Sequence, residues 1–260
     1  MFLNTLAENY KTYADKVAIE LLNDDGSSET ITYSKLQNQV NRTAAYLGSL
    51  GVKSGEQVAV QLPKCLPFIY IHLATMQLGA IFLPLNPAYP LSELAYFVGD
   101  AEPCVFIGDS NNSDMYEGLG NVQVVTLDPN SPQWTLDLAQ YEPIEIPLPT
   151  DPDQTALMLY TSGTTSRPKG AQITHGNLTA NIAGLHEAWG WQADDVILHV
   201  LPIFHVHGLI VALHGALHTG ATAVMMPKFD APTVLDLLQT KRFSVFICVP
   251  TFLLSPSYAP

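Results

Sequence analysis

The chain has 260 residues, of which 47% are apolar and 13% charged, and its formal net charge is −13. This length is close to the upper limit for one compact core, and the charged fraction is low for a globular protein, where about a quarter is usual. The negative charge argues against a protein that binds nucleic acid or an anionic membrane surface.

In chain order, apolar periodicity predicts short strands that alternate with helices. The predicted strands are 17–22, 30–33, 57–62, 80–85, 104–107, 122–127, 156–160, 195–200, 222–226 and 244–249. The predicted helices are 34–50, 66–78, 92–98, 176–189, 206–218 and 231–239, the first with Ser34 as its cap. This alternation is typical of an α/β fold with mostly parallel sheets flanked by helices.

A proline-rich segment interrupts this alternation. Residues 143–153 contain four prolines, which predicts a loop or linker. We therefore expect two parts: a first α/β subdomain, 1–150, and a second α/β subdomain, 151–260.

The segment 196–227 contains no Asp, Glu, Lys or Arg, and this length makes it a candidate for a membrane span. It also contains several histidines, and Pro202, Gly208, Gly215 and Gly220 interrupt it. A buried strand–helix–strand unit explains this pattern better, so we expect no membrane span.

The three cysteines, Cys65, Cys104 and Cys248, are far apart, and each lies beside an apolar segment. This pattern is typical of buried thiols in a reducing compartment. The N-terminus lacks both a basic region and a long apolar core, so a signal peptide is not expected. Both observations predict a cytoplasmic protein.

Residues 161–170 read TSGTTSRPKG and directly follow the predicted strand 156–160. A strand, a loop rich in Gly, Ser and Thr, and a helix together form a common phosphate site, in which backbone N–H groups, hydroxyls and a lysine contact the anion. The two cations of this loop stand out because no Lys or Arg occurs between Lys64 and Arg167. The loop is not a Walker A motif, because Gly170 follows Lys169 where that motif has Ser or Thr.

The order of these residues is more specific than their composition. Tyr160–Gly170 resembles the Y/F-T-S-G-T/S-T-G-x-P-K-G signature of adenylate-forming enzymes and differs from it only at Ser166, where the family usually has Gly. The segments Thr32–Leu36, Gly79–Pro87, Asp100–Pro103 and Thr174–Leu178 also resemble segments of that family. The resemblance therefore covers most of the chain.

The resemblance implies a two-step reaction in which ATP and a carboxylate give an acyl-adenylate and pyrophosphate, and a thiol, usually that of coenzyme A, then takes the acyl group. It implies contacts to the ATP phosphates from Thr161, Ser162, Gly163, Thr164, Thr165 and Lys169. Mg²⁺ would bridge the phosphates, held in the family by a Glu further along the chain.

Seven of the eight histidines lie between His175 and His218. The spacing of His214 and His218 would place them on one face of a helix, which makes a metal site one interpretation. No cysteine lies nearby and the flanking residues are apolar, so we expect core or pocket histidines and no bound metal.

The segment Leu201–Leu209 resembles the P-L-F-H-x-x-G segment of acyl-CoA synthetases, and its H-V-H-G-L form is similar to malonyl-CoA synthetases. The resemblance implies a catalytic position for His205 beside the acyl carboxylate. It also implies an acyl pocket formed by His205, His207, Val249, Pro250 and Thr251. In malonyl-CoA synthetases an Arg follows this last segment, whereas here no cation follows it.

The enzymes that this chain resembles are about twice as long, and no segment here matches their later Y-G-x-T-E and T-G-D motifs or their C-terminal lid domain. Two hypotheses follow. The chain is the N-terminal part of an acyl-CoA synthetase, inactive alone and in need of a C-terminal half, or it is a non-catalytic binding module derived from such an enzyme.

Overall fold

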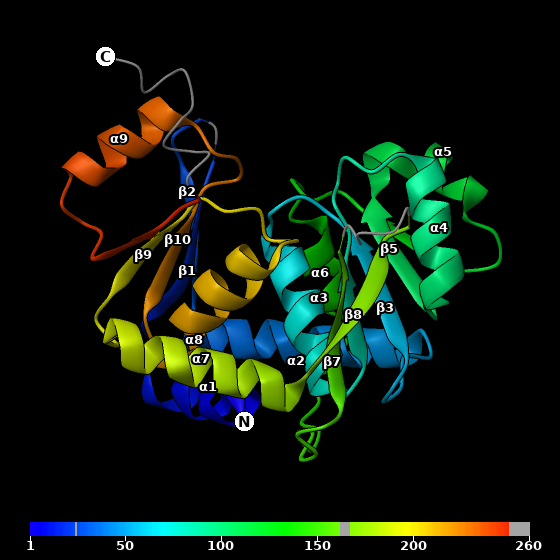
Figure 1. Ribbon diagram of the computed structural model, residues 1–260, viewed down its shortest axis with the longest axis horizontal. Helices are drawn as coiled ribbons and strands as arrows, with labels where there is room; N and C mark the ends of the chain where they lie inside the picture. The colour runs from blue at the N-terminus through cyan, green and yellow to red at the C-terminus, as the bar shows by residue number, and fades with distance from the viewer. Residues whose placement is uncertain (24, 162–166, 250–260) are drawn as a thin grey trace. The chain divides into compact units, whose positions relative to one another are not determined.

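The computed structural model describes residues 1–23, 25–161 and 167–249 (Figure 1). Its α-helices are α1 (Phe2–Thr12), α2 (Tyr33–Ser49), α3 (Leu66–Gln77), α4 (Leu91–Ala101), α5 (Ser113–Tyr116), α6 (Gln133–Leu138), α7 (His175–Trp189), α8 (Gly215–Thr219) and α9 (Ala231–Gln239). Its strands are β1 (Val17–Leu22), β2 (Ser28–Thr32), β3 (Gln57–Gln61), β4 (Ile81–Pro84), β5 (Val105–Asp109), β6 (Gln123–Leu127), β7 (Thr155–Thr161), β8 (Lys169–Thr174), β9 (Val196–His199), β10 (Thr222–Met225) and β11 (Val245–Ile247).

The described chain folds into two compact units, the first formed mainly by residues 37–179 and the second by residues 4–36 together with residues 180–249. This division differs from the boundary at residue 150 that the sequence predicts. The reason is a long-range pairing: β1, near the N-terminus, pairs in parallel with β10 and so belongs to the second unit. Residues 143–153 contain no helix or strand, as predicted, but they lie inside the first unit.

The first unit is built on a sheet with the strand order β6-β5-β3-β4-β7-β8. Its strands are parallel except β8, which runs antiparallel to β7 at one edge. The sequence around the central strands is apolar because both faces are covered: Val58, Ala59 and Val60 of β3 are fully buried. Helix α3 is buried on every side through its residues Leu66–Met76, which explains why it shows no polar face.

The second unit contains a sheet with the order β11-β9-β10-β1-β2. Strands β11, β9, β10 and β1 are parallel, and β2 returns antiparallel to β1. The mostly parallel sheets with flanking helices confirm the predicted fold class.

The uncharged segment 196–227 forms strand β9, helical turns that end in α8, and strand β10, as the sequence predicts. Among the described residues, no helix is both long and apolar enough to cross a membrane.

The cap of α2 was wrongly predicted. The helix begins at Tyr33, so the capping position moves to Thr32, whose Oγ1 accepts a hydrogen bond from the Lys35 amide at 3.3 Å. Ser34 lies within the first turn, where its hydroxyl is 3.1 Å from that of Thr32.

Candidate functional site

The predicted phosphate loop joins two antiparallel strands. The register of β7 and β8 runs from Thr155 opposite Thr174 to Thr161 opposite Lys169, and α7 begins only after β8. The strand–loop–helix order inferred from the sequence is therefore incomplete, because β8 lies between the loop and the predicted helix 176–189, which forms α7. The loop connects the arms of a hairpin, and no helix N-terminus follows it directly.

The hairpin brings together two of the predicted phosphate residues. Thr161 and Lys169 are direct cross-strand partners, and both are exposed. Directly opposite residues of an antiparallel pair project to the same face, with Cβ atoms about 5 Å apart. A hydroxyl and an ammonium group thus share one face at the open end of the hairpin. The other predicted contacts, Ser162, Gly163, Thr164 and Thr165, and the variant position Ser166 lie outside the described residues.

The neighbouring cross-strand pair, Tyr160 and Gly170, projects to the opposite face. A Cβ on Gly170 would lie 2.9 Å from the Met158 Sδ and 3.5 Å from the Tyr160 Cζ. The Tyr160 ring packs on Phe97 with 4.5 Å between ring centroids. The last glycine of the signature therefore has a packing role, because it leaves room for side chains of the facing strand.

The hairpin leaves the sheet at the carboxyl end of β7, where α/β sheets usually bind ligands. At the same edge of the sheet, Gln61 ends β3, which β4 separates from β7. Its side-chain amide donates to the carbonyl oxygens of Asn86 and Tyr89 at 3.0 and 3.1 Å.

Sequence reasoning assigned no role to Lys64, which follows β3 at this end of the sheet. Its exposed fraction is 7%, and burial lowers its pKa from 10.5 to about 7. A lysine with so low a pKa can lose its proton near neutral pH, as catalytic or binding lysines often do. One signal was present in the sequence, because Lys64 is the last cation before the long stretch without Lys or Arg.

The predicted acyl segment lies in the second unit, after β9. Residues 200–206 fold back so closely that a Cβ on Gly208 would lie 2.1 Å from the carbonyl oxygen of Pro202. The buried His199 ring nitrogen Nε2 is 2.8 Å from the carbonyl oxygen of Gly208, and this contact ties the turn to the end of β9. Gly208 is therefore required by backbone packing.

The side chains of His205 and His207 are both exposed. His207 is the first residue of a π-helix that spans His207–His214, and His205 lies two residues before it. Residues in π-helical turns are frequent at functional sites, because the wider turn displaces side chains from their usual positions. Partial desolvation lowers the pKa of His205, and the charge that His207 can carry lowers it further. His205 is thus biased toward the neutral form. Of the remaining predicted pocket residues, Val249 is half-buried, and Pro250 and Thr251 lie outside the described residues.

His214 and His218, which their spacing was expected to place on one helical face, contact different side chains. The His214 ring stacks on Phe2 at 4.2 Å, whereas the His218 ring contacts His186 at 5.9 Å. Within the described part of the chain, no group of three or more His, Cys, Asp or Glu side chains could hold a metal ion.

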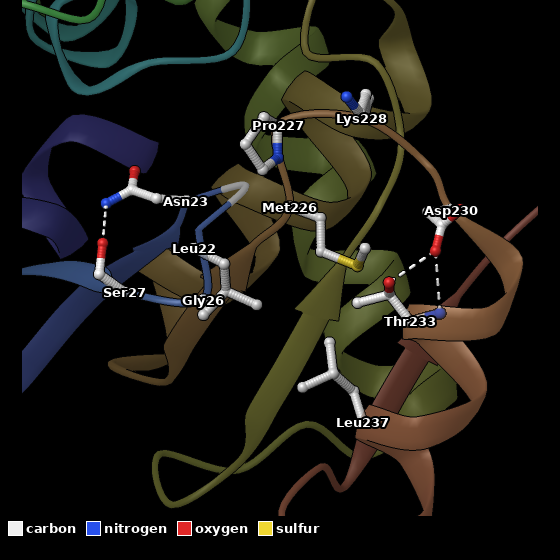
Figure 2. A pocket seen from close by; sticks show the side chains of 10 residues that line it. All are labelled: Leu22, Asn23, Gly26, Ser27, Met226, Pro227, Lys228, Asp230, Thr233 and Leu237. Atoms are coloured by element: carbon white, nitrogen blue, oxygen red, sulfur yellow. Dashed lines mark hydrogen bonds between the residues drawn. The ribbon is translucent and has the colours of Figure 1, made fainter.

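The second unit also has a pocket of about 550 Å³ that the sequence analysis did not foresee (Figure 2). It lies where the chain leaves β1 toward β2 on one side and leaves β10 toward α9 and β11 on the other. Such divergence of connections at the carboxyl ends of parallel strands opens a crevice for ligands. Apolar side chains from three segments of the chain, Leu22, Met226 and Leu237, line the pocket. Lys228 contributes a cation and Asp230 a carboxylate.

The chain matches the family model "AMP-binding enzyme" over residues 6–255. It belongs to the AMP-binding enzyme family. This membership confirms the resemblance inferred from the Tyr160–Gly170 signature.

Relatives in this family include the human mitochondrial malonate–CoA ligase ACSF3, which is 34% identical over 222 residues. The alignment covers 84% of this chain and 38% of that protein. A crotonobetaine/carnitine–CoA ligase from Escherichia fergusonii is 32% identical over 256 residues, which are 92% of this chain and 48% of the relative. The chain thus spans less than half the length of these two relatives.

Among solved structures, ATP-bound MatB from Rhodopseudomonas palustris matches the whole chain with a TM-score of 0.89 and 36% identity. The match covers 52% of the MatB chain. An inhibitor-bound N-terminal domain of FACL13 from Mycobacterium tuberculosis, at 24% identity, matches with a TM-score of 0.87 and shows the same fold.

Proposed function

We propose that this chain is the ATP-binding part of an acyl-CoA synthetase that activates a carboxylic acid as its adenylate and then transfers the acyl group to coenzyme A. The observation that carries the proposal is the exposed pair Thr161 and Lys169, which places a hydroxyl and a cation on one face of the signature hairpin. The ligase names of the relatives support the reaction class.

The described side chains fit a polyphosphate. Lys169 offers an ammonium group beside the Thr161 hydroxyl, and both are open to solvent. When a carboxylate attacks the α-phosphate of ATP, pyrophosphate leaves and negative charge grows on its oxygens. Donors already placed around those oxygens lower the barrier to this step. We extend the site to Ser162, Gly163, Thr164 and Thr165 from the sequence signature alone.

Mg²⁺ would arrive with the nucleotide and supply further positive charge to the phosphates. We assign none of the described residues to it. The contribution of this chain is the cation and the hydroxyl of the hairpin.

On the acid side we propose that His205 contacts the carboxylate of the substrate and that His207, Val249, Pro250 and Thr251 form the acyl pocket. A neutral His205 can still donate one N–H bond to a carboxylate oxygen, so its lowered pKa is compatible with this position. The name of the malonate–CoA ligase relative favours malonate or another short acid. We further propose that the protein acts in the cytoplasm, on the basis of its well-separated cysteines.

Coenzyme A carries several phosphate groups, and the pocket beside Lys228 is suited to part of it. The pocket combines apolar side chains with the cation of Lys228, and the carboxylate of Asp230, which also lines it, already accepts two hydrogen bonds from Thr233. It lies at the carboxyl edge of a parallel sheet. We propose that Lys228 contacts a phosphate of coenzyme A.

The test is made on the 260-residue chain with ATP and malonate. Calorimetry measures ATP binding, and a coupled assay measures pyrophosphate release. We expect wild-type chain to bind ATP and Lys169→Gln to bind it on the order of tenfold more weakly, since a charged hydrogen bond is lost. Equal affinity in both chains would contradict the proposed site.

A second candidate function is nucleotide binding without turnover. The observation behind it is the exposed pair Thr161 and Lys169, which accounts for a contact to phosphate and requires neither an acid nor a thiol. The same pair of measurements separates the two functions. Release of pyrophosphate that requires both ATP and an acid would establish adenylation by this chain. Binding of ATP without release of pyrophosphate would establish nucleotide binding without turnover.

A further inference from the structure

Helix α4 makes hydrogen bonds to both arms of the phosphate hairpin. The Tyr160 hydroxyl of β7 donates to the Asp100 Oδ2 at 2.6 Å. The Tyr96 hydroxyl donates to the carbonyl oxygen of Pro168 at 2.8 Å, directly before β8 begins. One helix therefore fixes the two arms close to the open end of the hairpin.

The spacing of these two residues of α4 explains how one helix reaches both arms. Tyr96 and Asp100 are four residues apart, so they lie one above the other on the same helical face. Phe97 is buried between the helix and the sheet, where its ring meets those of Tyr160 and Tyr89 at 4.5 and 5.1 Å. The hydrogen bonds thus lie at the border of an aromatic cluster that holds α4 against the hairpin.

The direction of the Tyr160 hydrogen bond is set by the protonation state of the phenol. Burial, and then the hydrogen bond and charge of Asp100, raise the pKa of Tyr160 above its ordinary value of 10.0. The phenol therefore keeps its proton at neutral pH and donates a hydrogen bond to Asp100. The Asp100 carboxylate is exposed, so the bond acts mainly by fixing geometry.

We propose that Tyr96 and Asp100 are positioning residues for the phosphate site. Tyr96 fixes the backbone one residue before Lys169, and Asp100 fixes the side chain one residue before Thr161 through its bond to Tyr160. Side chains alternate between the two faces of a strand, so residues held toward α4 direct their neighbours to the opposite face. This inference rests on the proposed function, in which that opposite face binds phosphate.

The first experiment follows the hairpin itself. Amide hydrogen exchange is measured in peptides that cover residues 155–161 and 167–175, for wild type, Tyr96→Phe and Asp100→Ala, which remove the donor of one bond and the acceptor of the other. We expect exchange in these peptides to become about fivefold faster, as for the loss of one hydrogen bond. The matched control is Tyr89→Phe, which removes a phenol from the same aromatic cluster. Within the described residues the Tyr89 hydroxyl makes no hydrogen bond, so exchange in the two peptides should stay unchanged.

The second experiment follows phosphate binding with inorganic tripolyphosphate as the probe and calorimetry as the readout. We expect Tyr96→Phe and Asp100→Ala each to weaken binding about fivefold at an unchanged melting temperature, and Tyr89→Phe to bind as wild type does. A double-mutant cycle with Lys169→Gln tests the mechanism. If Tyr96 acts through the placement of Lys169, Tyr96→Phe has no further effect once the lysine is gone.

The outcomes separate the two proposals. Wild-type chain that fails to bind tripolyphosphate, or binding that Lys169→Gln leaves unchanged, would overturn the proposed function and the positioning role together. Binding that depends on Lys169 but not on Tyr96 or Asp100 would overturn the positioning role alone. Additive effects in the cycle would also overturn it, because they would show a general loss of stability.

Discussion

Gly208 lies against the carbonyl oxygen of Pro202 so closely that an added Cβ would be 2.1 Å from that oxygen. Gly170 of the phosphate hairpin has a different neighbour, the flexible Met158 side chain, whose Sδ would lie 2.9 Å from the Cβ. A thioether can move to another rotamer, whereas a backbone carbonyl in a packed turn cannot move without its peptide unit. The two glycines of the signature segments are therefore expected to differ in their tolerance of substitution.

We predict that Gly208→Ala lowers the free energy of unfolding by about 3 kcal/mol and that Gly170→Ala lowers it by about 1 kcal/mol or less. Urea denaturation followed by circular dichroism measures both values. The control is Gly184→Ala on the exposed face of α7, where no described atom outside the helix's own backbone lies within 4 Å of the added Cβ. Equal losses at Gly208 and Gly170 would contradict the distinction between backbone and side-chain neighbours.

How far the sequence predicts this structure depends on burial. Val58–Val60 of β3 and most residues of α3 are buried and apolar, so the sequence pattern predicted both elements. Strand β8 was missed because its sequence, KGAQIT, is polar and lies at an exposed sheet edge. The incomplete strand–loop–helix interpretation of the phosphate site followed from that omission.

Two other omissions have different causes. Helix α1 buries Phe2, Leu6 and Tyr10, so a spacing of four residues was present in the sequence but was not used. The pairing of β1 with β10 joins segments about 200 residues apart, and the local pattern of apolar residues does not predict which distant strands will pair. For the same reason the two units, and the pocket beside Lys228, could be found only in the structure.

The ion pair between Glu20 of β1 and Arg242 gives a second stability prediction. Both guanidinium NH groups of Arg242 donate to the Glu20 carboxylate, whose side chain is 11% exposed, and this bond raises the pKa of Arg242. We expect Arg242→Ala to lower the free energy of unfolding by about 2 kcal/mol, because it leaves a nearly buried carboxylate without its partner. The arginine itself is 46% exposed, which keeps the loss below that of a fully buried pair.

A double-mutant cycle isolates this pair. Arg242→Ala in a Glu20→Gln background is expected to cost less than in the wild type, since no charge is then left unpaired. Equal costs in the two backgrounds would mean that Arg242 stabilises the unit through packing of its side chain, for example against Phe243, whose ring lies 5.8 Å from the guanidinium carbon.

The lowered pKa of His205 predicts a pH dependence with a definite sign. The folded chain binds a proton at His205 less readily than the unfolded chain, whose imidazole has the ordinary pKa of 6.5. The contribution of His205 to stability is therefore complete above about pH 6.5 and is lost as the pH falls below this value. Removal of the neighbouring charge in His207→Gln should raise the pKa of His205 part of the way, because desolvation is the larger cause.

Imidazole C–H resonances followed by NMR between pH 4 and 8 report this pKa directly. A pKa of His205 that does not change in His207→Gln would show that the two rings do not interact. A pKa that returns fully to about 6.5 would show that charge outweighs desolvation, against the expected order.

Lys228 provides the last prediction, which concerns the pocket in Figure 2. If its ammonium group contacts a phosphate of coenzyme A, Lys228→Gln should weaken coenzyme A binding about tenfold and leave tripolyphosphate binding unchanged. Calorimetry with both ligands on the 260-residue chain makes the comparison, and dephospho-coenzyme A reports whether the 3′-phosphate is the group involved.

Lys241→Gln is the matched control for Lys228→Gln, because Lys241 is an exposed lysine of the same unit that does not line the pocket. Raised salt should weaken wild-type binding more than that of Lys228→Gln, since screening acts on the charge that the substitution removes. Equal affinity of wild type and Lys228→Gln for coenzyme A would exclude this pocket as the binding site for a coenzyme A phosphate. An equal loss of affinity in Lys241→Gln would show that only the net charge of the chain matters.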